Sequence, residues 1–135
     1  MTEIKKPATA GATATLAIVS GFWLILEGIL YMVFDLALGE SWVQDLTAPF
    51  NFLYVGVSGV ILAVVLSFLS AAIIIVGGVL IFMRKYFIGG TVVMAISIFS
   101  IICGGGFWVS ILWGISASLI SFICPKIEKK INNSK

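Results

Sequence analysis

The sequence predicts an all-α integral membrane protein, a four-helix bundle with its N and C termini on the cytoplasmic side. Apolar residues make up 61% of its 135 positions and charged residues 10%, whereas soluble domains have roughly 45–50% and about 25%. Four apolar segments are each long enough for a membrane helix, which takes roughly 17–25 residues. All eight basic residues lie in three short patches between or beside these segments.

The basic patches predict the orientation in the membrane. They are Lys5–Lys6, Arg84–Lys85 and Lys126–Lys135, and four crossings put all three on one face. Basic residues in short loops stay cytoplasmic, so we expect a multi-pass protein of the cell membrane with both ends inside. The loops on the opposite face carry only Glu40 and Asp45.

The first half of the chain predicts two helices of unequal length. Helix 1 is expected over about residues 13–38, followed by an interfacial loop at 39–49. Helix 2 is expected over 50–83, where no charged residue occurs. At 1.5 Å per residue it would be about 50 Å long, so we expect it to project from the membrane or to bend.

The second half predicts two shorter helices in a tight hairpin. Helix 3 is expected over 86–103, after an inside turn at Arg84–Lys85. Three glycines, Gly104–Gly106, turn the chain outside, and helix 4 follows over 107–124. We expect Pro125 to end it, because proline interrupts helical hydrogen bonding. Residues 1–135 therefore form a single four-span domain.

Glu27 is a carboxylate near the middle of predicted helix 1, where burial in lipid is costly and often marks function. Ser70, Ser97 and Ser116 are predicted at similar depth, so the four residues are a candidate buried polar site. Three interpretations remain open. Glu27 could be neutral and structural, it could be a proton or cation site used in transport, or it could meet a polar group of a partner subunit.

Small residues at a spacing of four predict close helix packing, because membrane helices associate through such stripes. The candidate helix-packing interface is Gly59, Ala63, Ser67 and Ala71 on helix 2 and Gly106, Ser110, Gly114 and Ser118 on helix 4. Both stripes could pack inside one bundle, or one of them could face another protein chain.

The composition argues against catalysis. There is no histidine, the commonest zinc ligand and general base, no carboxylate pair within one site and no phosphate-binding loop. We therefore expect no enzyme activity, no catalytic residue, no metal and no cofactor. The basic residues form no stripe, so we expect no nucleic-acid partner. Cys103 and Cys124 are predicted on opposite membrane faces and therefore free, with lipidation of Cys124 or an interchain link through Cys103 as alternatives.

Two resemblances rest on these residues. The "LILEGIL" segment (24–30) and the "GGG" hairpin (104–106) look like those of small uncharacterised prokaryotic four-helix, glycine-rich membrane families, which implies a fold and no activity. Four helices with a glutamate in the first also resemble small multidrug resistance transporters, which would give Glu27 a proton-coupling role. The 11-residue first loop and the long second helix depart from that compact fold.

These observations predict a non-catalytic protein that acts through helix–helix packing. We expect the lipid bilayer as its surroundings and other membrane subunits or copies of itself as partners. It would be an accessory or scaffolding subunit of a larger membrane assembly, for example an oxidase-type complex, or a homo-oligomer. The alternative is a small proton-coupled transporter or channel that uses Glu27.

Overall fold

The computed structural model describes residues 8–38, 59–103 and 109–134, and every regular element among them is helical. The elements are α1 (Ala8–Leu38), α3 (Gly59–Phe82), α4 (Tyr86–Phe99), the 3-10 segment η2 (Ser100–Cys103) that continues α4, and α5 (Val109–Asn133). The predicted all-α class is confirmed for this part of the chain.

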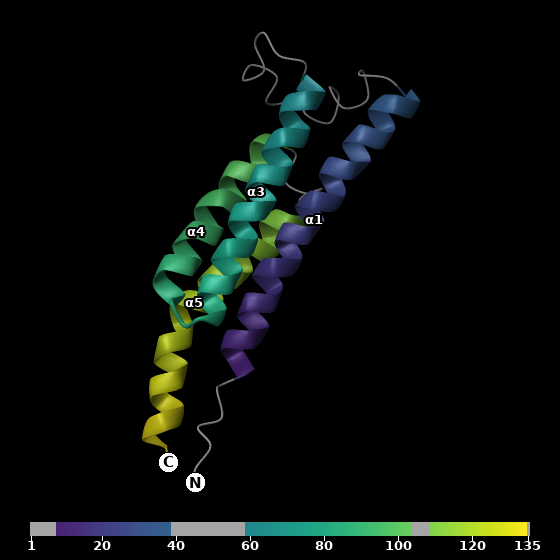
Figure 1. Ribbon diagram of the computed structural model, residues 1–135. Coiled ribbons are helices and arrows are strands. Elements are labelled where there is room, and N and C mark those ends of the chain that lie inside the picture. The colour runs from purple at the N-terminus through teal and green to yellow at the C-terminus, as the bar shows by residue number, and fades with distance from the viewer. Residues whose placement is uncertain (1–7, 39–58, 104–108, 135) are drawn as a thin grey trace.

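The four α-helices form an antiparallel bundle (Figure 1). Helix α1 packs against α3 and α5, and α4 packs against the same two helices. Successive helices run in opposite directions, so the α3–α4 turn lies toward the same end of the bundle as the start of α1 and the end of α5 (Figure 1). Residues far apart in the sequence therefore meet across one interior.

Three helices are long and apolar enough to cross a membrane. The candidate spans are Thr9–Val33 in α1, Val64–Phe82 in α3 and Val109–Asn133 in α5. Helix α4 is apolar but has only 14 residues. Together α4 and η2 rise about 29 Å, close to the roughly 30 Å of a hydrocarbon core.

Buried positions recur every seven residues in each helix. In α1 they form three series: Ala10, Ala17, Leu24 and Tyr31; Thr13, Ser20 and Glu27; Ala14, Gly21 and Gly28. In α5 the series are Ser110, Ala117 and Cys124; Ile111 and Ser118; Gly114 and Ser121. A seven-residue repeat is typical of left-handed helix bundles. Most members are small, so the backbones approach closely without a large apolar core.

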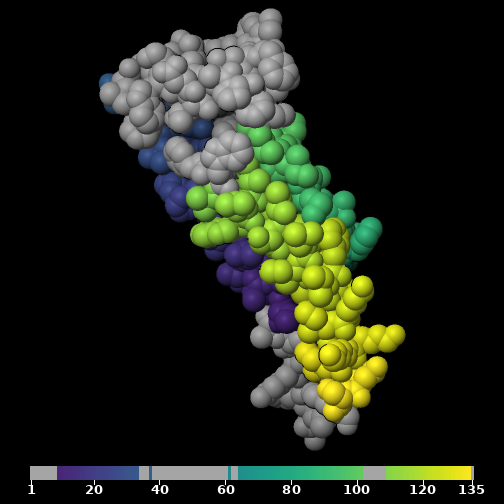
Figure 2. All heavy atoms as spheres, turned by 180° about the vertical axis from the view of Figure 1, so that it is seen from behind, coloured from purple at the N-terminus to yellow at the C-terminus, as the bar shows by residue number. Residues whose placement is uncertain are grey.

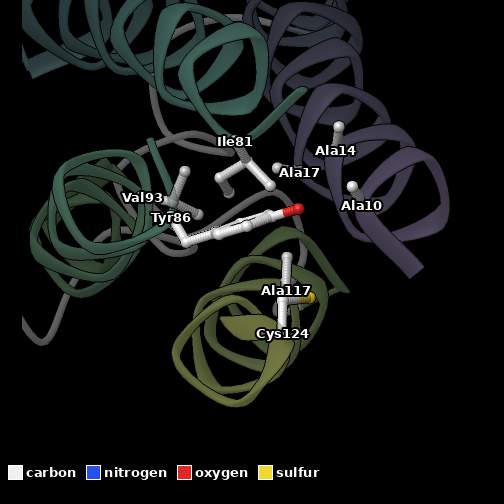
Figure 3. Close-up of a cluster of buried hydrophobic side chains, with 8 residues drawn as sticks. All are labelled: Ala10, Ala14, Ala17, Ile81, Tyr86, Val93, Ala117 and Cys124. Atoms are coloured by element: carbon white, nitrogen blue, oxygen red, sulfur yellow. The ribbon is translucent and has the colours of Figure 1, made fainter. Parts of the chain in front are cut away.

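A cluster of eight buried apolar side chains lies toward the end that holds the α3–α4 turn. The ring of Tyr86 lies between Ile81 and Val93 on one side and Ala117 and Cys124 on the other (Figure 3). Only 6% of Tyr86 is exposed. Cys124 is a buried free thiol, as predicted, whereas the side chain of Cys103 lies outside the described residues.

The two helices that bear the chain ends are longer than predicted. Helix α1 begins at Ala8 rather than Thr13, because the alanines there favour helix and Ala10 packs into the core cluster. The prediction that Pro125 ends the last helix is wrong, since α5 continues through it to Asn133. A proline removes one backbone hydrogen bond, and the turns beyond it resume. Those turns extend past the first turn of α1 (Figure 2).

The α3–α4 turn has the geometry of a helix C-cap. Lys85 N–H donates to Leu80 O and Arg84 N–H to Ile81 O, both at 2.9 Å. These are the two hydrogen bonds of a Schellman motif. Arg84 has φ = 64°, in the left-handed region where glycine is usual. The predicted turn at Arg84–Lys85 is therefore present, with arginine at the left-handed position.

Several predictions fall on other parts of the chain. The interfacial loop at 39–49, the first part of predicted helix 2 (50–58) and the Gly104–Gly106 turn lie outside the described residues. Within the described range, α3 runs from Gly59 to Phe82, close to the predicted end at 83.

Candidate functional site: the polar interior around Glu27

Glu27 is fully buried in α1 and has a hydrogen-bond partner on the same helix. The Tyr31 hydroxyl, one turn further along, donates to Glu27 Oε1 at 2.9 Å. The exposed fraction is 0% for Glu27 and 1% for Tyr31. Residues four apart lie on the same helix face, so α1 alone builds this acid–phenol pair.

Glu27 lies in the half of α1 that is nearer the C-terminal end of the helix. The candidate span of α1 is centred on Gly21, so Glu27 lies about 9 Å toward the C-terminal end of α1. A Cβ added to Gly28 of α1 would lie 3.3 Å from the ring of Phe68 on the neighbouring α3. This register puts Ser67 and Ser70, both buried, near the level of Glu27.

The predicted polar layer is corrected at two of its serines. Ser97 is buried beside Gly114, at the level of Ser20, which precedes Glu27 by about 10 Å of helix rise. Ser116 is exposed, and its hydroxyl donates to Leu112 O at 2.6 Å in its own helix. It cannot reach the interior, because at 100° per residue it points away from the inward-facing Gly114 and Ser118.

A second polar contact joins α1 to α5. Ser20 Oγ donates to Ser110 O at 2.8 Å, Ser110 Oγ donates to Ser20 O at 2.9 Å, and the two hydroxyls are 2.9 Å apart. On the same helix faces, nearer the end of the bundle that holds the α3–α4 turn, Thr13 Oγ1 lies 3.6 Å from Cys124 Sγ. These contacts were missed as a site, although Thr13, Ser20 and Glu27 are seven residues apart, a spacing that is visible in the sequence.

Four buried polar atoms have no hydrogen-bond partner among the described residues. They are Thr9 Oγ1 near the start of α1, and Trp23 Nε1, Ser67 Oγ and Ser97 Oγ further along the bundle. Trp23 also forms a tilted ring pair with Trp113, with centroids 6.1 Å apart. Buried polar atoms are nearly always paired with protein or water, so these atoms are unusual features of the interior.

The small-residue stripes lie inside this chain's own bundle wherever the structure describes their surroundings. Ser67, Ala71, Ser110, Gly114 and Ser118 are all buried. Ser118 Oγ donates to Gly90 O at 2.9 Å, which ties α5 to α4. The surroundings of Gly59, Ala63 and Gly106 lie outside the described part of the chain. The five described members are therefore used in packing one chain.

No metal site is found in residues 8–38, 59–103 and 109–134, where no three His, Cys, Asp or Glu side chains gather. The simplest ligand that the Glu27 carboxyl can bind is a proton. Comparison with known proteins adds no further assignment: no family model, curated protein or solved structure matches the chain.

Proposed function

We propose that this chain is a non-catalytic, multi-pass membrane protein that passes protons or small cations through its bundle by way of Glu27. One observation carries the proposal. Buried polar side chains recur every seven residues on the inner face of α1, at Thr13, Ser20 and Glu27. The carboxyl of Glu27 is the last of the three. An ionisable group inside a span is expensive to bury and usually serves a function.

The interior supports a proton route better than a route for larger solutes. Successive members of the series Thr13, Ser20 and Glu27 are about 10 Å apart along α1. Ser97 Oγ, which has no hydrogen-bond partner among the described residues, lies at the level of Ser20. The packing there is close, since a Cβ added to Gly114 would lie 1.9 Å from Ser97 Oγ. A proton moves over hydrogen-bonded steps of about 3 Å, so single water molecules would have to connect the hydroxyls with Glu27, while a molecule the size of a drug has no room.

The orientation is part of the proposal. Arg84, Lys85 and Lys129 line one groove, and Lys126 and Lys130 lie on the same last turns of α5. We place this basic end in the cytoplasm, because short basic loops are retained there. With α4 and η2 as the fourth crossing, both ends of the chain then face the cytoplasm.

Glu27→Gln tests the proposal in sealed proteoliposomes that report internal pH. The glutamine keeps the size and an oxygen that can accept from Tyr31, but it cannot titrate. We expect the wild type to carry protons down a gradient and Glu27→Gln to lose this flux while its helix content and thermal unfolding stay unchanged. Glu128→Gln makes the same chemical change at the basic end and should retain the flux. Equal flux in wild type and Glu27→Gln, or no flux in wild type, contradicts the proposal.

A second function is favoured by the same close packing. If the interior is too tight even for a proton relay, the chain acts through its outer helix faces, as an accessory or scaffolding subunit of a membrane assembly or as a homo-oligomer. The mass of the particle extracted in mild detergent separates the two. Other proteins in the particle, at fixed ratio to this chain, favour the subunit role; a particle of this chain alone that carries protons excludes it.

A further inference from the structure

A groove at the basic end of the bundle combines charged side chains with apolar surface. It has a volume of about 820 Å³. The α3–α4 turn and the first turn of α4 form one wall, and the last turns of α5 form the other. Its polar lining consists of Arg84, Lys85, Glu128, Lys129, Asn132 and Asn133.

The charge of the groove favours an anion. Three basic side chains and one carboxylate line it, and that carboxylate is already engaged, because the Tyr86 hydroxyl donates to Glu128 Oε1. The Asn132 and Asn133 amides add neutral donors at the rim. A phosphate group would meet lysine and arginine, the side chains that most often bind it.

The apolar part of the groove leads away from the charges. Tyr86, Phe87 and Pro125 line the groove and also a second hollow of about 260 Å³ that continues to Ser121 and Phe122. Ser121 and Phe122 precede Pro125 on α5, so the second hollow extends from the charged groove toward the middle of the spans. The rings of Phe87 and Phe122, 5.9 Å apart, connect α4 to α5 along it.

Arg84 is held in the groove wall by an uncommon backbone conformation. Its φ of 64° is one that glycine adopts freely and that costs other residues energy. A sequence selected only for a stable turn would be expected to have glycine here. An arginine that keeps this conformation is consistent with a role for its guanidinium in the groove.

We propose that this groove binds the phosphate headgroup of an anionic phospholipid, with one acyl chain in the adjoining apolar hollow between α4 and α5. The two hollows share three lining residues, which suits a molecule with a charged head and an apolar tail. A soluble phosphate would use the charged part only. Basic pockets at the cytoplasmic ends of membrane helices are typical sites for anionic headgroups.

Lipid binding is measured on the full chain in detergent, by native mass spectrometry with equal amounts of phosphatidylglycerol and phosphatidylcholine. We expect wild type to retain phosphatidylglycerol preferentially. Arg84→Gln with Lys129→Gln should weaken its binding about 30-fold, on the basis of about fivefold for each cation near a membrane surface. The matched control is Lys126→Gln with Lys130→Gln, which removes two exposed charges of the same helix end that do not line the groove, and should bind as wild type does.

Further variants separate binding in this groove from a general attraction of lipid to the basic end. Phe87→Ala should lower phosphatidylglycerol retention, while Phe99→Ala, an exposed position on the same helix, should not. Should Arg84→Gln disturb the turn, Lys129→Glu alone tests the charge, because Lys129 is exposed on the last turns of α5. Equal retention of both lipids by wild type, equal loss in the two double variants, or full competition by millimolar glycerol phosphate would each overturn the proposal.

Discussion

Gly114→Ala should break the closest helix contact in the polar interior. A Cβ added at this position would lie 1.9 Å from Ser97 Oγ and 2.9 Å from Ser97 Cβ. The hydroxyl can rotate away, but the Cβ is fixed to the α4 backbone. Ordinary contacts begin at 3.4 Å, so α4 and α5 must separate by about 0.5 Å locally to admit the methyl group.

The size of the effect is the difference between two opposing contributions. Overpacking of this kind costs about 1–3 kcal/mol. Replacing glycine by alanine within a helix returns about 0.5–1 kcal/mol. We therefore expect Gly114→Ala to lower the free energy of unfolding by about 1 kcal/mol, and by at most about 2.5 kcal/mol.

Gly11→Ala is the matched control, because a Cβ at Gly11 would have nothing within 4 Å. It keeps the gain in helix propensity without the clash, so the difference between the two variants isolates the overpacking. The assay is reversible unfolding in mixed micelles, followed by circular dichroism. In the Gly114→Ala background, Ser97→Gly should restore more stability than Ser97→Ala, which leaves the Cβ in place. Equal stability of Gly114→Ala and Gly11→Ala would refute the close approach of α4 and α5.

Three further predictions address the rest of the interior. In a double-mutant cycle of Ser20→Ala and Ser110→Ala, we expect a coupling energy of about 0.6 kcal/mol from the contact between the two hydroxyls, whose oxygens are 2.9 Å apart; because each hydroxyl also donates to the other residue's carbonyl, full stability of both single variants would mean that α1 and α5 do not meet there. Gly89→Ala should destabilise more than Gly114→Ala, since its Cβ would lie 2.7 Å from Gly77 O and 2.9 Å from Ile81 N, backbone atoms that cannot rotate away; the same unfolding assay compares the two, and a milder effect contradicts this register. In a Cys103→Ser background, Cys124 should resist maleimide labelling until the bundle unfolds, because it is fully buried; rapid labelling of the folded protein would place it elsewhere.

The sequence predicts the class of the fold because the signal is compositional. Apolar segments free of charge, separated by short basic patches, suffice to give helices of about the right length and the turn at Arg84–Lys85. The end of α5 was not predictable from Pro125, since a proline removes one hydrogen bond and the helix can resume if the residues after the proline are held by tertiary contacts. Here those residues include Glu128, which accepts from Tyr86.

The candidate site was predictable at Glu27 and less so around it. A single carboxylate within an apolar segment can be recognised from the sequence alone. Which residues of other helices lie next to it depends on how the helices are shifted along one another. That shift is set by contacts such as Gly28 against Phe68, which no single segment encodes. Counting residues along separate helices therefore put Ser116 in a layer that it does not join. The seven-residue spacing of Thr13, Ser20 and Glu27 was the available signal for the inner face.

A bundle that crosses the membrane four times has its described basic residues at one membrane face, and single-cysteine labelling at Arg84 and Lys126 tests this arrangement most directly. Each cysteine is introduced alone, with Cys103 and Cys124 replaced by serine, and membrane vesicles of known orientation are treated with a reagent that cannot cross lipid. Labelling of both positions from the cytoplasmic side is the predicted result. Labelling from opposite sides would mean that the segment from Tyr86 to Lys126 crosses the membrane an odd number of times, and the four-span account would fail.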